Sequence, residues 1–301
     1  MATVSIVIPA FIRTPGHAAL LDETLYSVDQ QSVTDYQVIV VDDGSPVGMQ
    51  TEVENVVDRH PKTELLRQQN GGSAAARNAG IAGCSGDFVV FLDADDHLLP
   101  AALATGLSAL AGHPECGFTV GAREEMTFEG APVGWEVAPP PPQTDLYLPL
   151  LAFDWYIIPP SSVMFRRAVV DEVGGFQDPW GADDLDFYLR AAHRYRAWCT
   201  QLPPVTRYRR YSLSSSRDGE RMLHSVRAVY TRQWPLVEGK AAAEAAFHRG
   251  LHLLTDIFLD CLVENMEDRI RAGDQQGALR SAQLLAEESP ERLRIPFDQL
   301  L

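Results

Sequence analysis

Short apolar runs alternate with longer mixed stretches through the first 112 residues of the chain. The runs at 4–8, 37–41 and 88–92, with a shorter one at 64–67, are the length of strands, and their continuous apolarity indicates strands covered on both faces. The stretches between and after them, at 18–31, 48–59, 74–82 and 101–111, predict helices. Strands that alternate with helices in this way form a parallel sheet with right-handed crossovers. The pattern therefore predicts an α/β fold.

Polar and acidic residues follow three of these predicted strands directly. Pro9 stops the first strand, Asp43 closes the second, and residues 93–96 follow the fourth. In a parallel sheet the carboxyl ends of the strands share one edge, and ligands bind beyond it. We therefore expect a binding site at this edge. Beside it, the glycines of 70–72 permit a tight turn, and Ser73 is expected to cap the following helix.

Three carboxylates, those of Asp93, Asp95 and Asp96, lie within four residues. Acids this close repel one another, and either protonation of one acid or a divalent cation with oxygen ligands relieves the repulsion. A solvated turn before the next helix explains the same residues, since Asp is common in turns and caps. Both interpretations stay open from these residues alone.

The pattern changes after residue 112. An extended stretch at 117–121 precedes four consecutive prolines at 139–142, which favour a stiff surface connection over a ligand for a partner domain. Trp155 and Tyr156 then precede a predicted strand at 163–165 and a helix that ends near Gly174. These amphipathic aromatic side chains suit the wall of a substrate site, and core packing explains them equally well.

Two charged groups occupy the region from 181 to 217. Asp183 and Asp184 fall in the first turn of a predicted helix, where they serve either as helix-dipole partners or, for one of them, as a general base. Arginines then gather around Tyr208 and a serine run, which suits either a bound phosphate or a solvated face; they are Arg207, Arg209, Arg210 and Arg217.

The region from about 241 to 288 is predicted to be helical. Its apolar stripe is made of Leu251, Leu254, Phe258, Leu262 and Met266, and the glycines at 273 and 277 break it into two helices. A helical hairpin that covers the main domain and a homodimer interface both remain open.

Composition narrows the class of protein. With 301 residues, the chain can form one sizeable α/β domain with additions or two separate cores. Its 25 basic and 41 acidic residues give a net charge of −16, which argues against nucleic acid as a partner. The only lysines, Lys62 and Lys240, lie outside any phosphate-binding glycine loop, which excludes lysine-dependent P-loop chemistry.

Location can also be predicted from the sequence. The four cysteines are far apart, with no metal-type spacing, and the N-terminal residues do not have the pattern of a signal peptide. We expect free thiols and a cytoplasmic protein. No apolar segment approaches the length of a membrane span, so any contact with a membrane is expected to be peripheral.

Six motifs, taken together, resemble glycosyltransferase family 2, the inverting nucleotide-sugar-dependent enzymes with the GT-A fold. The resemblance covers about the first 215 residues and implies a GT-A domain at 1–216, with a nucleotide-binding half at about 1–112, an acceptor-side half at about 113–216, and a C-terminal helical extension at 217–301. The GT-A fold is a Rossmann-like, mostly parallel sheet with helices on both faces. The motifs, in order, are VSIVIPAF from Val4, VVDDGS from Val40, NGGSAAARNAGI from Asn70, FLDADD from Phe91, VGGF from Val173 and GADDLDFYLR from Gly181.

The resemblance implies a role for each residue at the sheet edge. It places the nucleotide against Pro9, Ala10 and Phe11. Asp43 would contact the nucleobase, with Asp42 beside it. The resemblance also places Arg77 nearby. The clustering of Arg209 and Arg210, rather than the resemblance, motivates the hypothesis that they share the charge of the diphosphate.

The acidic residues receive separate roles by the same resemblance. Asp95 would hold a divalent cation, Mn²⁺ or Mg²⁺, that bridges the diphosphate, while Asp93 would contact the ribose or the metal shell and Asp96 would support either. Asp184 matches the family's general base, and Asp183 stands where the family has Glu. Such an arrangement neutralises the leaving diphosphate and deprotonates an attacking hydroxyl from the opposite face.

The implied partners are a nucleotide diphosphate sugar, with uridine diphosphate as the expected carrier, and a glycan, lipid-linked or small-molecule acceptor. Trp155 and Tyr156 are placed on the acceptor side. One departure concerns the segment 208–214, where the family often has a histidine and this chain has Tyr211, so an additional metal ligand is missing or replaced.

Three other functions explain some of these sequence features but not all of them. A nucleotide-binding regulatory protein without activity is disfavoured by the intact Asp95 and Asp184. A sugar nucleotidyltransferase usually needs a basic glycine-rich loop after the first strand, and here that loop has only Arg13. A glycoside hydrolase with paired carboxylates leaves the motifs after the first and second strands unexplained.

Overall fold

The computed structural model describes residues 3–136, 145–177, 181–200, 203–210 and 217–293. Contacts divide the chain into two compact units. The first comprises Met1–Leu150, Trp155–Pro179 and Asp183–Tyr211, and the second Leu151–Asp154, Trp180–Ala182 and Ser212–Leu301. The predicted boundary at residue 216, the proline run at 139–142 and Tyr211 lie outside the described residues.

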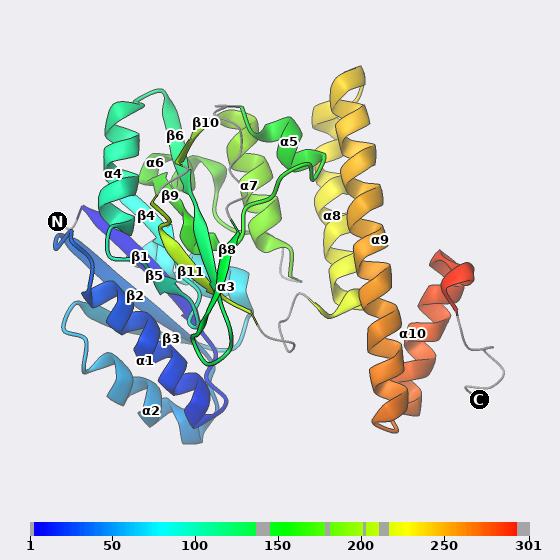
Figure 1. The fold of residues 1–301 in the computed structure, drawn as a ribbon, viewed down its shortest axis with the longest axis horizontal. Helices are drawn as coiled ribbons and strands as arrows, with labels where there is room; N and C mark the ends of the chain where they lie inside the picture. Colours follow the sequence, from blue (N-terminus) through cyan, green and yellow to red (C-terminus); the bar gives the residue numbers. More distant parts are fainter. Residues whose placement is uncertain (1–2, 137–144, 178–180, 201–202, 211–216, 294–301) are drawn as a thin grey trace. The chain divides into compact units, whose positions relative to one another are not determined.

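A seven-stranded sheet forms the centre of the first unit (Figure 1). Its strand order is β10-β6-β9-β4-β1-β2-β3, and only β9 among these seven runs antiparallel to its neighbours. The mostly parallel sheet predicted from the sequence is confirmed. The strands are β1 (Val4–Ala10), β2 (Tyr36–Asp43), β3 (Thr63–Gln68), β4 (Phe88–Phe91), β6 (Cys116–Gly121), β9 (Val163–Arg166) and β10 (Arg196–Thr200).

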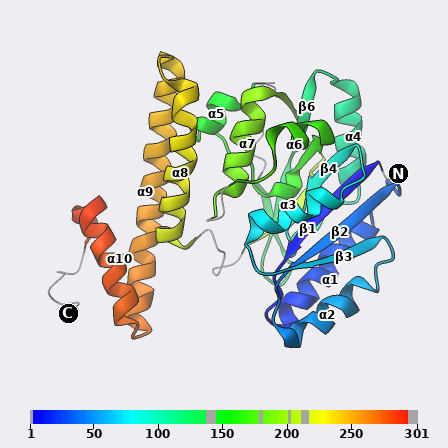
Figure 2. The same ribbon diagram turned by 180° about the vertical axis from the view of Figure 1, so that it is seen from behind.

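Helices cover both faces of this sheet, as Figures 1 and 2 show from opposite sides. Helices α1 (Pro15–Asp29), α2 (Val47–Val57) and α4 (Ala102–Gly112) share one apolar core with alternate residues of β1 and β2, such as Ile6 and Val40. The opposite face carries α3 (Ser73–Gly83), α6 (Arg167–Val173) and α7 (Asp183–Arg194). Full burial of the central strands explains why their sequences are continuously apolar rather than alternating.

Helix α3 lies unusually close to β1. A Cβ atom built on Gly80 would clash with Cγ1 of Val7, so only glycine permits this approach. Beyond it, four aromatic rings from β4, β9 and α7 and the turn after α6 pack together beneath the sheet edge: Phe91, Phe165, Phe176 and Phe187.

A second sheet has the strand order β5-β11-β7-β8. Its strands are β5 (His97–Leu98), β7 (Arg123–Met126), β8 (Pro132–Glu136) and β11 (Thr206–Arg209). Antiparallel pairing of β11 with β5 sets Arg207 opposite His97. The arginine-rich segment near residue 208 is therefore held beside the acidic residues that follow β4.

The second unit is helical. It contains α8 (Gly219–Val237), α9 (Ala241–Arg271), α10 (Gln275–Glu288) and a short 3₁₀ turn at Pro290–Arg292. The predicted break near Gly273 is confirmed, since this glycine has a φ of 76° and Asp274 accepts a hydrogen bond from the Gly277 amide at 2.9 Å to cap α10. Of the predicted stripe, Leu251 is only half-buried, and four members are buried: Leu254, Phe258, Leu262 and Met266.

Short helix α5 (Tyr147–Leu151) completes the described helices. All four cysteines are free thiols, as predicted. Within the described residues, no helix is both long enough and apolar enough to span a bilayer.

Candidate active site

Three parallel strands bring the predicted nucleotide residues to one edge of the main sheet. In register, Ala10 of β1 lies beside Asp42 of β2, and Val7 lies beside Phe91, the last residue of β4. Phe11 follows β1 and is 43% exposed, whereas Ala10 is buried. The edge therefore presents an exposed aromatic side chain close to the acidic ends of β2 and β4.

Asp43 shapes the loop that precedes α3. Its carboxylate is buried and accepts hydrogen bonds from the amides of Gly71 and Gly72, both at 2.8 Å, and from Nε2 of Gln68 at 2.7 Å. The neighbouring Asp42 accepts from the Ser45 amide at 2.9 Å. Contact between either acid and a nucleotide base stays a prediction, and the structure gives both acids a role in holding the loops around that position.

The prediction that Ser73 caps α3 is wrong. Gly72 occupies the N-cap position, and Ser73 is the first helical residue. Its hydroxyl instead donates to Oδ1 of Asp183 at 3.3 Å. Without an oxygen-bearing side chain at residue 72, the first amides of α3 receive no side-chain cap.

Arg77 joins the two groups of acids. The buried guanidinium donates to Oδ1 of Asp93 at 2.8 Å and to Oδ2 of Asp183, and it lies 5.2 Å from the centre of the Phe176 ring. Although burial lowers the pKa of Arg77, Asp183 and Asp93 outweigh it and raise the pKa above its ordinary value. Arg77 therefore stays charged and fixes the end of β4 against the start of α7.

Asp184 titrates near neutral pH. Burial, reinforced by the charge of Asp183, raises the pKa of Asp184 to about 7, while Arg77 opposes the shift. Asp183 is held by Arg77 and Ser73, so the two adjacent acids have different surroundings. A carboxyl group with a pKa near the working pH is well matched to accept a proton from a hydroxyl.

Two tyrosines complete the polar surroundings and were missed as site residues. Burial and the charge of Asp184 raise the pKa of Tyr188, which follows Asp184 by one helical turn. Burial and the charge of Asp96 raise the pKa of Tyr208, which places this phenol near the acidic loop. Only the four-residue spacing from Asp184 signalled Tyr188 in the sequence.

Within the acidic loop, the three carboxylates differ in exposure. The Asp93 side chain is 30% exposed, and Asp95 is half-buried. Asp96 is fully buried, its Oδ1 accepts from the Arg209 amide at 2.9 Å, and its Oδ2 has no hydrogen-bond partner among the described residues. Burial, Asp95 and Asp93 raise the pKa of Asp96 well above its ordinary value, so protonation of Asp96 relieves part of the repulsion.

The fit to a divalent cation can be judged from the donor atoms. The described residues contain no group of three or more His, Cys, Asp or Glu side chains arranged to hold a metal. Mg²⁺-type sites in nucleotide enzymes commonly use one or two carboxylates, with substrate phosphates and water supplying the other ligands. Asp93 and Asp95 fit such a site because both carboxylates are partly exposed at the sheet edge.

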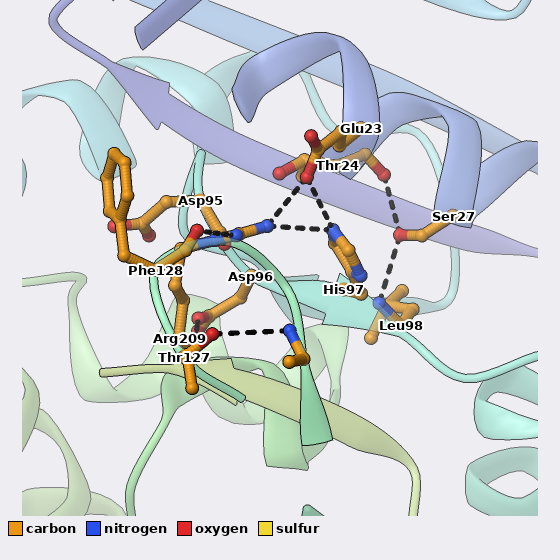
Figure 3. A network of polar contacts seen from close by, with 11 residues as sticks. Glu23, Thr24, Ser27, Asp95, Asp96, His97, Leu98, Thr127, Phe128 and Arg209 are labelled. Atoms are coloured by element: carbon orange, nitrogen blue, oxygen red, sulfur yellow. Dashed lines mark hydrogen bonds and ion pairs between the residues drawn. The ribbon is translucent and has the colours of Figure 1, made fainter. Parts of the chain in front are cut away.

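Arg209 links the acidic loop to Glu23 of α1 (Figure 3). Its guanidinium is buried and donates to the carbonyl oxygens of Asp95, at 2.8 Å, and of Phe128, and to Oε2 of Glu23 at 2.7 Å. His97 lies 3.2 Å away. These contacts give Arg209 a structural role, and its contact with the diphosphate stays a prediction.

The other arginines of the cluster each pair with an acid. Arg207 donates to Glu124 at 2.8 Å, Arg210 donates to Glu125 at 2.9 Å, and Arg217 lies 3.7 Å from Glu264. The side chain of Arg210 is 63% exposed, and its contact with a diphosphate stays a prediction.

The acceptor-side aromatic residues, Trp155 and Tyr156, are half-buried. Arg123 lies 5.8 Å from the centre of the Tyr156 ring and donates to the Ile158 carbonyl at 3.0 Å. Their contact with an acceptor stays a prediction.

The mostly parallel sheet with helices on both faces is the GT-A fold, which defines a class of transferases. A model of the family described as glycosyl transferase family 2 matches residues 5–174. The chain therefore belongs to glycosyl transferase family 2, and it is a glycosyltransferase.

Several known proteins are similar to this chain. The uncharacterized glycosyltransferase YwdF of Bacillus subtilis (strain 168) is 32% identical over 197 residues, which cover 64% of this chain and 69% of that protein. Matches to three further curated relatives cover only 27% to 33% of each relative's length.

Solved structures share the fold. S. aureus TarS 1-349 in complex with UDP-GlcNAc has a TM-score of 0.65 at 16% identity, covering all of this chain and 84% of that one. The mannosyltransferase PcManGT from Pyrobaculum calidifontis, in complex with GDP-Man and Mn²⁺, has a TM-score of 0.60 at 22% identity, covering 99% and 82%.

Proposed function

We propose that this glycosyltransferase moves a sugar from a nucleotide diphosphate sugar to an acceptor hydroxyl with inversion at the anomeric carbon. One observation carries the proposal: Arg77 bridges Asp93 at the end of β4 and Asp183 at the start of α7. In this proposal Asp93 belongs to the donor side, and Asp183 adjoins the general base Asp184. One guanidinium, that of Arg77, joins the two sides. A direct displacement needs these two functions on opposite faces of the sugar.

Different residues of the chain have separate roles in the proposed transfer. Asp184, with a pKa of about 7, takes the proton of the acceptor hydroxyl as that oxygen attacks. Asp183 stays fixed by Arg77 and Ser73 and favours the neutral form of Asp184 until the hydroxyl arrives. Phe11 and the ends of β1 and β2 form the nucleotide side.

Asp93 and Asp95 would hold a divalent cation, Mn²⁺ or Mg²⁺, together with the diphosphate of the donor. The cation supplies charge neutralisation of the leaving nucleoside diphosphate. The Mn²⁺ complex of PcManGT supports this part of the proposal.

We propose a uridine diphosphate sugar as the donor. The UDP-GlcNAc complex of TarS, which shares the fold, supports this choice. The acceptor is proposed to be a glycan, lipid-linked or small-molecule hydroxyl. A cytoplasmic location, with peripheral contact to a membrane, stays a prediction.

The variant Asp184→Asn tests the mechanism, because it keeps the shape of the side chain and removes its proton affinity. We expect this variant to bind UDP like the parent chain and to lose transfer by a factor of roughly 10² to 10⁴. The rate is measured as release of UDP from a panel of UDP sugars, with and without candidate acceptors.

The matched control is Asp58→Asn, which changes an exposed acid at the end of α2. It should leave the rate unchanged. UDP release by Asp184→Asn at the parental rate would contradict the assignment of the base.

A further inference from the structure

A pocket of about 610 Å³ opens on the α1 side of the first unit. It lies among the outer face of α1, the residues after α2, the segment of β5 and the start of β11, and none of its lining residues has a role in the proposed transfer. Its lining includes Asp22, Glu23, Tyr26, Gln30, Arg59 and Pro100. Its volume is typical of sites for small molecules.

The charges around this pocket are paired with one another. Asp22 lies 2.7 Å from Arg59, and Glu23 lies 2.7 Å from the buried Arg209. Arg207, at the other side, pairs with Glu124 at 2.8 Å. Because each arginine is already matched by an acid, the pocket has no excess of positive charge with which to hold a phosphate or another anion.

These lining side chains remain partly exposed although they are paired. The side chain of Asp22 is 41% exposed, that of Glu23 52% and that of Arg59 54%. Acceptors and donors therefore stand side by side around the rim. A hydroxyl group both donates and accepts, so a ligand with many hydroxyl groups satisfies both kinds.

An aromatic ring adds an apolar surface to this polar rim. Tyr26 is 63% exposed on α1, although its neighbours Leu25 and Ser27 are buried. Leu99 and Pro100 contribute further apolar atoms to the lining. A ring that exposes one face beside planar polar groups suits a ligand that is apolar on one face and hydroxylated at its edge.

We propose that this pocket binds a neutral oligosaccharide, with the Tyr26 ring against the apolar face of one sugar and the side chains of Asp22, Gln30 and Arg59 at its hydroxyl groups. The binding itself does not depend on the proposed transfer. A role in holding the distal part of an acceptor or product glycan rests on the proposed function.

The test uses ligand-observed saturation-transfer NMR on the full chain with maltotetraose, cellotetraose and chitotetraose. At least one of these probes should receive saturation from the protein. Tyr26→Ala should weaken its binding about five-fold or more, whereas Tyr26→Phe should retain it, because the ring and not the hydroxyl supplies the platform. Far-UV circular dichroism checks that each variant is folded.

A matched control is Val47→Ala, which truncates an 83% exposed side chain on α2 outside the pocket and should leave binding unchanged. Absence of saturation transfer to all three tetrasaccharides would overturn the proposal, as would undiminished binding by Tyr26→Ala. Competition by excess UDP would assign the sugar to the transfer site and would also overturn it. Failure of the Asp184→Asn prediction would leave all of these outcomes untouched.

Discussion

Asp184 stands next to an acid that Arg77 and Ser73 hold in place, so the two neighbouring acids have different surroundings. Asp183 has an arginine and a serine as partners, while Asp184 accepts a hydrogen bond from the amide of Leu185, at 2.7 Å. The charge of Asp183 and burial both disfavour a second negative charge. In the proposed function, Asp183 is the acid that positions and Asp184 is the acid that exchanges a proton.

The pH dependence of transfer follows from this shift. The pKa of Asp184 is raised to about 7, and the base must be ionised, so the rate should rise with pH. We expect about a ten-fold rise per pH unit below the pKa and a plateau above it. Rates of UDP release from pH 5.5 to 8.5 in one buffer series provide the measurement, since the range spans the value of about 7.

Binding of UDP, measured across the same range, serves as the control and separates titration of the base from loss of the nucleotide. A rate that is flat between these limits would contradict an ionisation of Asp184 near neutral pH.

The sequence identified most acids of the site, because each directly follows an apolar strand or opens a helix. It did not show which of them are exposed. Asp96 looks equivalent to Asp95 in the sequence, yet it is fully buried beneath Arg209. Arg209 looked like an exposed cation, yet it is buried and pairs with Glu23, which lies 186 residues earlier in the chain.

At the scale of helices and strands, Arg77 ties together three elements that are distant in the sequence. It extends from α3 to the end of β4 and to the first turn of α7. When a buried charged side chain is removed or shortened, the charges of its partners are left unpaired in the protein interior, which solvates them poorly.

We therefore expect Arg77→Lys to lower the free energy of unfolding by about 3 kcal/mol, because lysine lacks the planar fork that serves two carboxylates at once. Urea denaturation gives this value. Arg59→Lys is the matched control: the Arg59 side chain is 54% exposed in its pair with Asp22, so the loss should stay below about 1 kcal/mol. Equal losses of unfolding free energy in the two variants would show that the buried bridge contributes no more to stability than the exposed Arg59–Asp22 pair.

Element prediction succeeded where apolar periodicity was strong and failed where charge interrupted it. The alternating strands and helices up to residue 112 were predicted to within a few residues. The second sheet was missed because its strands, such as the polar β7 with Arg123 and Glu124, carry charges that pair across the sheet. Helix α8 lies within the helical extension predicted at 217–301, but its bounds were not predicted, although Asp218 accepts a capping bond from the Arg221 amide at 3.1 Å.

At the scale of the whole molecule, ligand binding should be visible as stabilisation. A ligand that binds only the folded state adds about 2.7 kcal/mol at one hundred times its dissociation constant. We expect UDP to raise the melting temperature, and Mn²⁺ to increase that shift through the Asp93 and Asp95 carboxylates.

Differential scanning fluorimetry with UDP, Mn²⁺ and both together measures these shifts. Asp95→Ala should abolish the increment due to Mn²⁺, and Glu52→Ala, at an exposed position on α2, should keep it. An increment that survives in Asp95→Ala would remove that residue from the proposed metal site.

Oligomeric state lay beyond the reach of the sequence. The apolar stripe of α9 suggested either a helical hairpin or a homodimer, but an apolar periodicity predicts burial without naming the partner. Phe258, Leu262 and Met266 are already buried within a single chain, so the stripe gives no separate support for a dimer. The homodimer stays a prediction.

The contact between Gly80 and Val7 has a consequence for how this site tolerates change. Gly80 lies one turn after Arg77 on α3, and its lack of a side chain lets α3 lie close against β1. At this short distance Arg77 contacts both Asp93 and Asp183. Gly80, which has no side chain, thus sets the position from which Arg77 contacts both acids. In directed evolution of this enzyme, Gly80 should resist replacement as strongly as the acids themselves.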